Sequence, residues 1–305
     1  MQQSLQHGNP IQTKYEGLGG QTTPVLIPAA YSTSFLFGMS NSGKSALIQS
    51  NPDAYVFNLD ATSTVTPTSK AVLWPRIAPA AAGLFIDDSG VPFVFRYEHM
   101  AEKVAKLIEL AQQNKPRPKT VCFDSLTAWQ RMLVEYIPRN AKTLGISANN
   151  DLQWKDLHGP AAWDLLYESI INTIISLRNA GYGVYVVGHI TRRWIPINEN
   201  QHKLEFEFTI TDNFWKRLVP IFQLSACMAT EKGVTTERKV TKVMANGKEH
   251  EVTKDVNTET TNHYLYFKRD DLINMTKGRV VSSKILIPKD NAWAAFESAY
   301  DSSPV

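Results

Sequence analysis

The stretch Gly38-Met39-Ser40-Asn41-Ser42-Gly43-Lys44-Ser45 decides the fold class of this chain. It matches the pattern G-x-x-x-x-G-K-[ST] at every fixed position. The apolar run Ser34–Phe37 leads into it, and the helix-compatible run Ser45–Gln49 leads out of it. A glycine loop between a strand and a helix wraps backbone N–H groups around phosphate oxygens, and the helix N-terminus adds partial positive charge. The stretch therefore predicts a phosphate-binding loop rather than a chance match in a Ser/Gly turn.

The loop also predicts a nucleotide and a magnesium ion. Lys44 is expected to reach the β- and γ-phosphates, and the Ser45 hydroxyl is expected to ligate Mg²⁺. We predict ATP as the nucleotide. The residues expected to hold it are Gly38, Ser40, Asn41, Ser42, Gly43, Lys44, Ser45 and Ala46.

The composition is that of an ordinary globular chain. It has 305 residues, of which 43% are hydrophobic, and a formal net charge of +3 from 32 basic and 29 acidic residues. This balance requires any basic surface to be local. Cys122 and Cys227 both lie in apolar runs, which predicts buried free thiols and a reducing, cytoplasmic compartment. No apolar run approaches the length of about 18 residues that a membrane span needs, and the N-terminus lacks the features of a signal peptide.

Apolar runs predict strands that alternate with helices, which is typical of a mostly parallel sheet covered on both faces. Residues 61–83 are expected to be irregular, and Asp88-Ser89-Gly90 suits a hairpin turn. The strands expected from apolar runs are Phe35–Phe37, Tyr55–Leu59, Val121–Phe123, Val184–Val187 and Phe222–Met228, and the helices are Ala101–Gln113 and Ala161–Ala180.

The chain is expected to divide into four parts. Residues 1–30 form an extended arm, and residues 31–232 form the α/β core. Residues 233–262 form a projecting hairpin, because this polar stretch is centred on the strong turn signal Asn246-Gly247. Residues 263–305 complete the core with a strand pair, Tyr264–Phe267 with Val280–Ile287, and a short helix.

A second carboxylate is needed to hold Mg²⁺ beside a phosphate loop. Asp124 closes the buried strand Val121–Phe123 and is the favoured metal ligand. The alternative role for Asp124 is to cap the following helix. Asp87 and Asp88 are the rival pair, although the residues after them suit a turn better than a helix start.

Two further polar residues follow strands and are candidates for catalysis. Ser125, rather than an acid, follows Asp124, so the water-activating carboxylate must come from elsewhere. Asp60 ends the second strand and can polarise the attacking water, unless it is only a turn residue. His189 follows the strand Val184–Val187 and can contact the γ-phosphate or the water and report hydrolysis to the loop that follows. The alternative is a hydrogen-bonded histidine at a strand end.

Together, the stretches Gly38–Ser45, Val121–Thr127 and Val186–His189 resemble the core of RecA. More narrowly, the sequence is similar to phage-encoded RecA-like ATPases of the single-strand annealing and recombination type, roughly from Ser34 to Arg279. The resemblance implies a RecA-like phosphate-loop NTPase core with a C-terminal β-hairpin extension, located in the host cytoplasm if the chain is phage-encoded.

The resemblance also implies residue roles. Asp60 takes the place where such proteins more usually carry Glu, and His189 takes a position that is often Gln. Such proteins form rings or filaments that complete a neighbour's site with basic residues. Lys268 and Arg269 are the match here, with Arg279 as a second choice, unless all three lie on a solvated hairpin end. Such a cation increases phosphoryl-transfer rates by about 10³–10⁵.

Single-stranded DNA is the predicted partner. RecA-like proteins bind it through loops after the later strands, and the matching stretch runs from Thr191 through Arg192, Arg193 and Trp194 to about Arg217. Cations beside aromatic rings suit sequence-tolerant binding of single strands. However, acidic and apolar residues alternate along Leu204–Phe208, and this alternation is typical of a half-buried strand.

The predicted function is therefore an oligomeric, Mg²⁺-dependent ATPase that acts on single-stranded DNA in phage-type recombination or replication. One alternative is a nucleotide-gated assembly or scaffold protein without DNA binding. Another is a small-molecule kinase, which would need a lid of arginines near a substrate pocket.

Overall fold

The structure is a computed structural model, and it describes most of the chain. For residues 192–198, 201–206 and most of 235–257 the structure describes the backbone alone and not the side chains. The described ranges are residues 27–60, 69–77, 85–86, 89, 91–149, 152–157, 160–198, 201–245, 248–268, 276 and 282–303.

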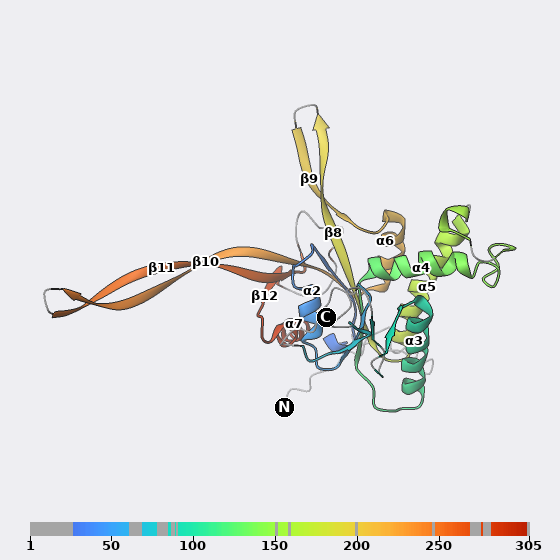
Figure 1. Ribbon diagram of the computed structural model, residues 1–305, viewed down its shortest axis with the longest axis horizontal. Coiled ribbons are helices and arrows are strands. Elements are labelled where there is room, and N and C mark those ends of the chain that lie inside the picture. Colours follow the sequence, from blue (N-terminus) through green and yellow to red (C-terminus); the bar gives the residue numbers. More distant parts are fainter. Residues whose placement is uncertain are drawn as a thin grey trace, which may run out of the picture.

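A nine-stranded sheet forms the centre of the molecule (Figure 1), with eight strands in the order β12-β11-β10-β1-β8-β7-β2-β3 and β9 paired to β8. The strands from β10 to β3 in this order run parallel, whereas β11 and β12 are antiparallel to their neighbours. Their bounds are β1 Thr33–Gly38, β2 Ala54–Asn58, β3 Val72–Trp74, β7 Thr120–Asp124, β8 Gly183–Asn198, β9 Gln201–Phe208, β10 Leu224–Ala245, β11 Lys248–Tyr266 and β12 Lys284–Ile287.

Helices cover both faces of this sheet, and the alternation of side chains along each strand explains why. In β1, Phe35 and Phe37 join the cluster that includes helices α3, α4, α5 and α6, whereas Leu36 joins the cluster that includes α2 and α7. Successive residues of a strand point to opposite faces, so a strand covered on both sides must be apolar throughout. The helices are α2 Lys44–Gln49, α3 Tyr97–Gln112, α4 Leu126–Arg139, α5 Pro160–Asn179, α6 Asp212–Leu218 and α7 Ala292–Asp301.

Two antiparallel ribbons leave the sheet at the edge where the parallel strands end (Figure 1). One is β8 with β9, in which Ile190 pairs with Phe208 and the pairing continues to Asn198 and Gln201. The other is β10 with β11, which pairs from Cys227 and Tyr266 out to Ala245 and Lys248. This last pair flanks a two-residue connection, as the sequence predicted, although Asn246 and Gly247 themselves lie outside the described residues.

The predicted fold class is confirmed: the sheet is mostly parallel, has helices on both faces and carries antiparallel C-terminal strands. The expected strands and helices are present with shifted ends. The hairpin around residue 89 is also confirmed, because β5 Phe85–Ile86 pairs antiparallel with β6 Pro92–Phe93. Cys122 and Cys227 are both buried and neither is in a disulfide, as predicted. No helix within the described ranges is long and apolar enough to cross a membrane.

Two parts of the chain differ from the prediction. Residues 61–83 are not irregular throughout, because Val72–Trp74 forms β3 at the sheet edge and Arg76–Ile77 forms β4, which pairs with β5. The run Ala71–Trp74 is apolar, but it is too short to stand out from its Pro- and Thr-rich surroundings. The four-part division of the chain stays a prediction. Ala29 and Ala30, at the end of the predicted arm, are buried, and the Ala29 N–H donates to Asp301 Oδ1 at 2.7 Å.

We expect Trp129→Ala to destabilise the protein by about 3–5 kcal/mol, because it leaves a cavity in the core. Trp129 is fully buried and stacks on Phe123 with 4.1 Å between ring centroids. The control is Trp163→Ala, whose side chain is 41% exposed and which should cost about 1.5 kcal/mol or less. Urea unfolding measures both. Equal losses would contradict the layered core.

Candidate functional site: a phosphate loop and the ends of four parallel strands

In the loop that follows β1, two positions, 38 and 43, have a backbone geometry and surroundings that only glycine can adopt. A Cβ atom at Gly38 would collide with the Met228 carbonyl oxygen. Gly43 has a φ of +99°, and a Cβ atom there would lie 2.9 Å from His263 Nδ1. Positive φ is strained for residues with side chains. Both fixed glycines of the sequence pattern are therefore required by the close packing of the loop against β10 and β11.

Lys44 is held inside the loop. Lys44 is only 4% exposed. Its Nζ donates hydrogen bonds to the carbonyl oxygens of Gly38 at 3.0 Å and Met39 at 2.7 Å. Burial lowers the pKa of Lys44 from 10.5 to about 8, and the negative charges of Asp124 and Asp60 oppose this shift. The ammonium group therefore lies within electrostatic reach of both carboxylates that the sequence singled out.

Asp124 is buried at the C-terminal end of β7. Strand β8 lies between β7 and β1, and the pairs Gly38 with His189 and Asp124 with Val187 place these ends at one edge of the sheet. The capping alternative for Asp124 is wrong. Ser125 is the N-cap of α4, and its side chain accepts a hydrogen bond from the Ala128 N–H at 3.5 Å.

Asp60 and His189 contact each other, with 3.5 Å between His189 Nε2 and Asp60 Oδ2. Burial acts to raise the pKa of Asp60, but hydrogen bonds from His189 and Ser125 and the positive charge of Arg131 outweigh it, so the pKa is lowered. Asp60 is therefore held as a carboxylate. His189 Nδ1 is buried without a hydrogen-bond partner among the residues described.

The structure also separates some of the candidate residues from this site. Lys268 is exposed and lies three residues beyond Leu265, which pairs with Met228, the β10 partner of Gly38. Because β11 runs antiparallel to β1, the chain at Lys268 lies three residues back along the sheet from the edge that carries the loop. Arg269, Arg279, Asp87 and Asp88 lie outside the described residues.

The stretch predicted as a DNA-binding loop is mainly a ribbon and a helix. Thr191 to Asn198 continue β8, and the alternative that Leu204–Phe208 forms a strand is confirmed by β9. Phe208, Phe214 and Trp215 are buried, and Phe208 and Trp215 pack on Phe35 with ring centroids 5.6 and 5.1 Å away. These rings belong to the core and cannot serve as an exposed stacking platform.

Three residues near the site have contacts there that no sequence pattern predicted. His263 in β11 lies against the loop, and its Nδ1 is 2.8 Å from the Ser42 carbonyl oxygen. Ser125, just before α4, hydrogen-bonds to Asp60, and Arg131, within α4, interacts with it electrostatically. Asp60 comes within electrostatic range of Arg131 because β2 and β7 are neighbours in the sheet, and no sequence pattern indicates that pairing. No sequence pattern indicates a role for His263 either, because this residue comes at the end of a long polar stretch.

The fold and the site together define a phosphate-loop protein of the α/β class, with a nucleotide site at the C-terminal edge of a parallel sheet. A family model described as an AAA domain matches residues 31–274. This range covers most of the chain, so the chain belongs to this family of AAA-type, phosphate-loop ATPases. No curated protein matches the sequence.

We expect the affinity for ATP to fall about tenfold per pH unit above pH 8. Lys44 has a pKa of about 8 in the free protein, and bound phosphates keep it charged, so binding above that pH requires uptake of a proton. Below pH 8 the lysine is already charged and the affinity should be level. Titration calorimetry between pH 7.5 and 9.5 measures the slope.

The matched control for this pH profile is Lys44→Arg, because a guanidinium stays charged over the whole range. Its affinity should not vary with pH, whatever its value at pH 7.5. A level profile in the unmodified protein, or the same slope in both proteins, would contradict the role given to Lys44.

Proposed function

We propose that this chain is a Mg²⁺-dependent ATPase that acts on single-stranded DNA in phage-type recombination or replication. The observation that supports this most is the position of Lys44, buried in a glycine-bounded loop within electrostatic reach of Asp124 and Asp60. A cation in a concave set of backbone groups, with carboxylates nearby, suits a triphosphate together with its magnesium ion.

The donors near the loop fit Mg²⁺. This ion prefers oxygen ligands and is usually bound by one or two protein side chains together with phosphate oxygens. Ser45 directly follows Lys44 at the start of α2, and Asp124 closes β7 at the same sheet edge. When bound, the ion neutralises charge that develops on the phosphates. Ser45 and Asp124 would hold it, and Lys44 would bind the β- and γ-phosphates.

Asp60 is the proposed base for the attacking water. A general base must be ionised and within hydrogen-bond reach of the water, and the lowered pKa of Asp60 meets the first condition. Asp60 contacts His189, and this contact lets the imidazole orient the carboxylate. We therefore propose His189 as a positioning residue that also senses the γ-phosphate.

The proposed DNA contact lies on the ribbon of β8 and β9. Strand β8 runs without interruption from the core through His189 to Arg192 and Arg193 and then to Asn198. A change at His189 can therefore move the two arginines through a continuous strand. Lys and Arg side chains bind the backbone of single-stranded nucleic acid, and this binding weakens with salt.

The proposed oligomer uses the end of β11. Lys268 is exposed, follows this strand and lies three residues back along the sheet from the level of the loop. A cation in that place is available to the site of a neighbouring copy, where it would stabilise charge in the transition state. We propose this role for Lys268 and for Arg269, the next residue.

We expect Asp60→Asn to lower the rate of ATP hydrolysis by about 10²–10⁴-fold while changing the affinity for ATP little, because a general base acts only in the chemical step. The control is Asp53→Asn, before β2, where the carboxylate is 46% exposed and pairs with Lys119 at 2.7 Å. Steady-state kinetics and a binding titration measure both effects. Normal turnover in Asp60→Asn would overturn the assignment.

We expect the double variant Arg192→Ala/Arg193→Ala to lose most of its ATP-dependent affinity for a fluorescent oligonucleotide, with the residual binding still measurable at low salt. The salt slope, log K against log[salt], should become shallower by about 1.4, since each lost phosphate contact removes about 0.7. The control is Lys106→Ala/Lys115→Ala, which removes two exposed cations in and just after α3. No ATP-dependent binding by the unmodified protein at low salt, or equal loss in the control, would contradict the DNA proposal.

A further inference from the structure

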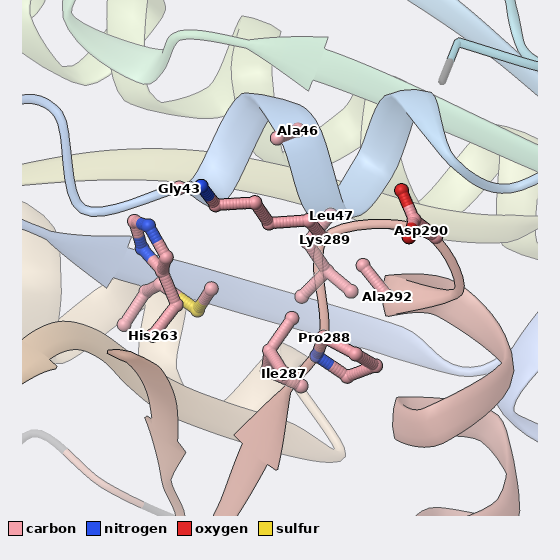
Figure 2. Close-up of a pocket in the computed structure, with 10 residues that line it drawn as sticks. Gly43, Ala46, Leu47, His263, Ile287, Pro288, Lys289, Asp290 and Ala292 are labelled. Carbon is pink, nitrogen blue, oxygen red and sulfur yellow. The ribbon is translucent and has the colours of Figure 1, made fainter. Parts of the chain in front are cut away.

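A pocket of about 280 Å³ opens beside the phosphate loop. It lies between the first turn of α2 and the segment that joins β12 to α7, with His263 at one end next to Gly43 and Asp290 at the other (Figure 2). This volume lies just below the usual range for ligand pockets, about 300–1,000 Å³. It therefore suits one part of a nucleotide rather than the whole molecule.

Most of the pocket wall is apolar. Ala46 and Leu47 come from α2, and Ile287 and Pro288 come from the end of β12 and the turn that follows. Figure 2 shows these two pairs on opposite sides of the pocket. Apolar walls with a few polar groups at the ends are typical of sites for flat organic rings, whereas the phosphates of a nucleotide need N–H groups and cations.

The polar groups of the pocket are two acceptors, on His263 and Asp290, and one donor, the Lys289 ammonium, which reaches toward Gly43 and His263 (Figure 2). His263 Nδ1 lies 2.8 Å from the Ser42 carbonyl oxygen, and a carbonyl oxygen can only accept, so Nδ1 carries the hydrogen. In the neutral ring this leaves Nε2 as an acceptor. Asp290, at the other end, accepts through its carboxylate. Two acceptors and one donor favour a ligand whose edge offers N–H donors together with a ring-nitrogen acceptor.

Gly43 belongs to both the pocket and the phosphate loop, and Ala46, which also lines the pocket, directly follows the loop on α2. A ligand whose phosphates lie in the loop can therefore place its other end in the pocket without leaving the surface of α2. We propose that this pocket holds the base of the bound nucleotide, and that His263 and Asp290 favour bases that carry an exocyclic amine. The proposal rests on the proposed function, because it needs a nucleotide in the loop.

The first test compares ligands on the unmodified protein. ATP should bind at least about tenfold more tightly than inorganic tripolyphosphate and than purine riboside triphosphate, which differs from ATP only in lacking the amine. Equal affinity for ATP and tripolyphosphate overturns the pocket as a base site but leaves the phosphate loop intact. Equal affinity for ATP and purine riboside triphosphate overturns the preference for an amine. Binding of neither ATP nor tripolyphosphate overturns the proposed function itself.

The second test fills the pocket. Ala46 is exposed on α2, and Ala46→Leu should weaken ATP at least about tenfold while weakening tripolyphosphate less than about twofold, because the larger side chain occupies the space of the base. The control is Ala105→Leu, at an exposed position of α3, which should change neither. Equal loss of both ligands in Ala46→Leu, or no loss of ATP, overturns the proposal.

A third readout locates the base directly. Photolabelling with 8-azido-ATP should modify His263 or residues 287–292, and Ala46→Leu should reduce the labelling at least about tenfold. Labelling confined to other segments, with normal binding of the probe, overturns the pocket assignment even where both affinity tests agree with it.

Discussion

The candidate site depends on one arrangement of strands. Four parallel strands, β1, β8, β7 and β2, lie next to one another and end at the same edge of the sheet. Strand pairing joins Gly38 to His189, and it joins Val187, two residues before His189, to Asp124 and through Asp124 to Asn58. The residues that follow these ends then have only a short distance to bridge, which is why Asp60 meets His189 although they are far apart in sequence. The apolar interior of each strand fixes this arrangement, since both faces are covered by helices.

The sequence predicted the parts of the site that one local pattern specifies. The loop Gly38–Ser45 has glycine at its two fixed glycine positions because the backbone there approaches β10 and β11 too closely for a side chain. Asp124 could be predicted because a polar residue that closes an all-apolar strand must lie at the sheet edge. The capping role could not be separated from the metal role, because both residues at this junction, Asp124 and Ser125, are common helix caps.

What the sequence could not predict depends on contacts between distant segments. His263 reaches the loop only because β11 folds back along β10 after a long ribbon. The aromatic residues Phe208 and Trp215 suggested a stacking surface, but they fill the space beside Phe35 in the core. When polar and apolar residues alternate along a segment, composition and periodicity do not show which aromatic rings are buried. Tertiary packing against Phe35 determines that these two rings are buried.

The most direct measurement of the central claim is a crystal structure of the protein with Mg²⁺ and a non-hydrolysable ATP analogue. The account predicts phosphates against Gly38–Ser45, with the Lys44 ammonium turned from the carbonyls of Gly38 and Met39 toward them. It also predicts that Ser45 and Asp124 hold the ion and that the attacking water lies beside Asp60. Phosphates bound elsewhere, or an ion that contacts neither Ser45 nor Asp124 even through water, would contradict the account.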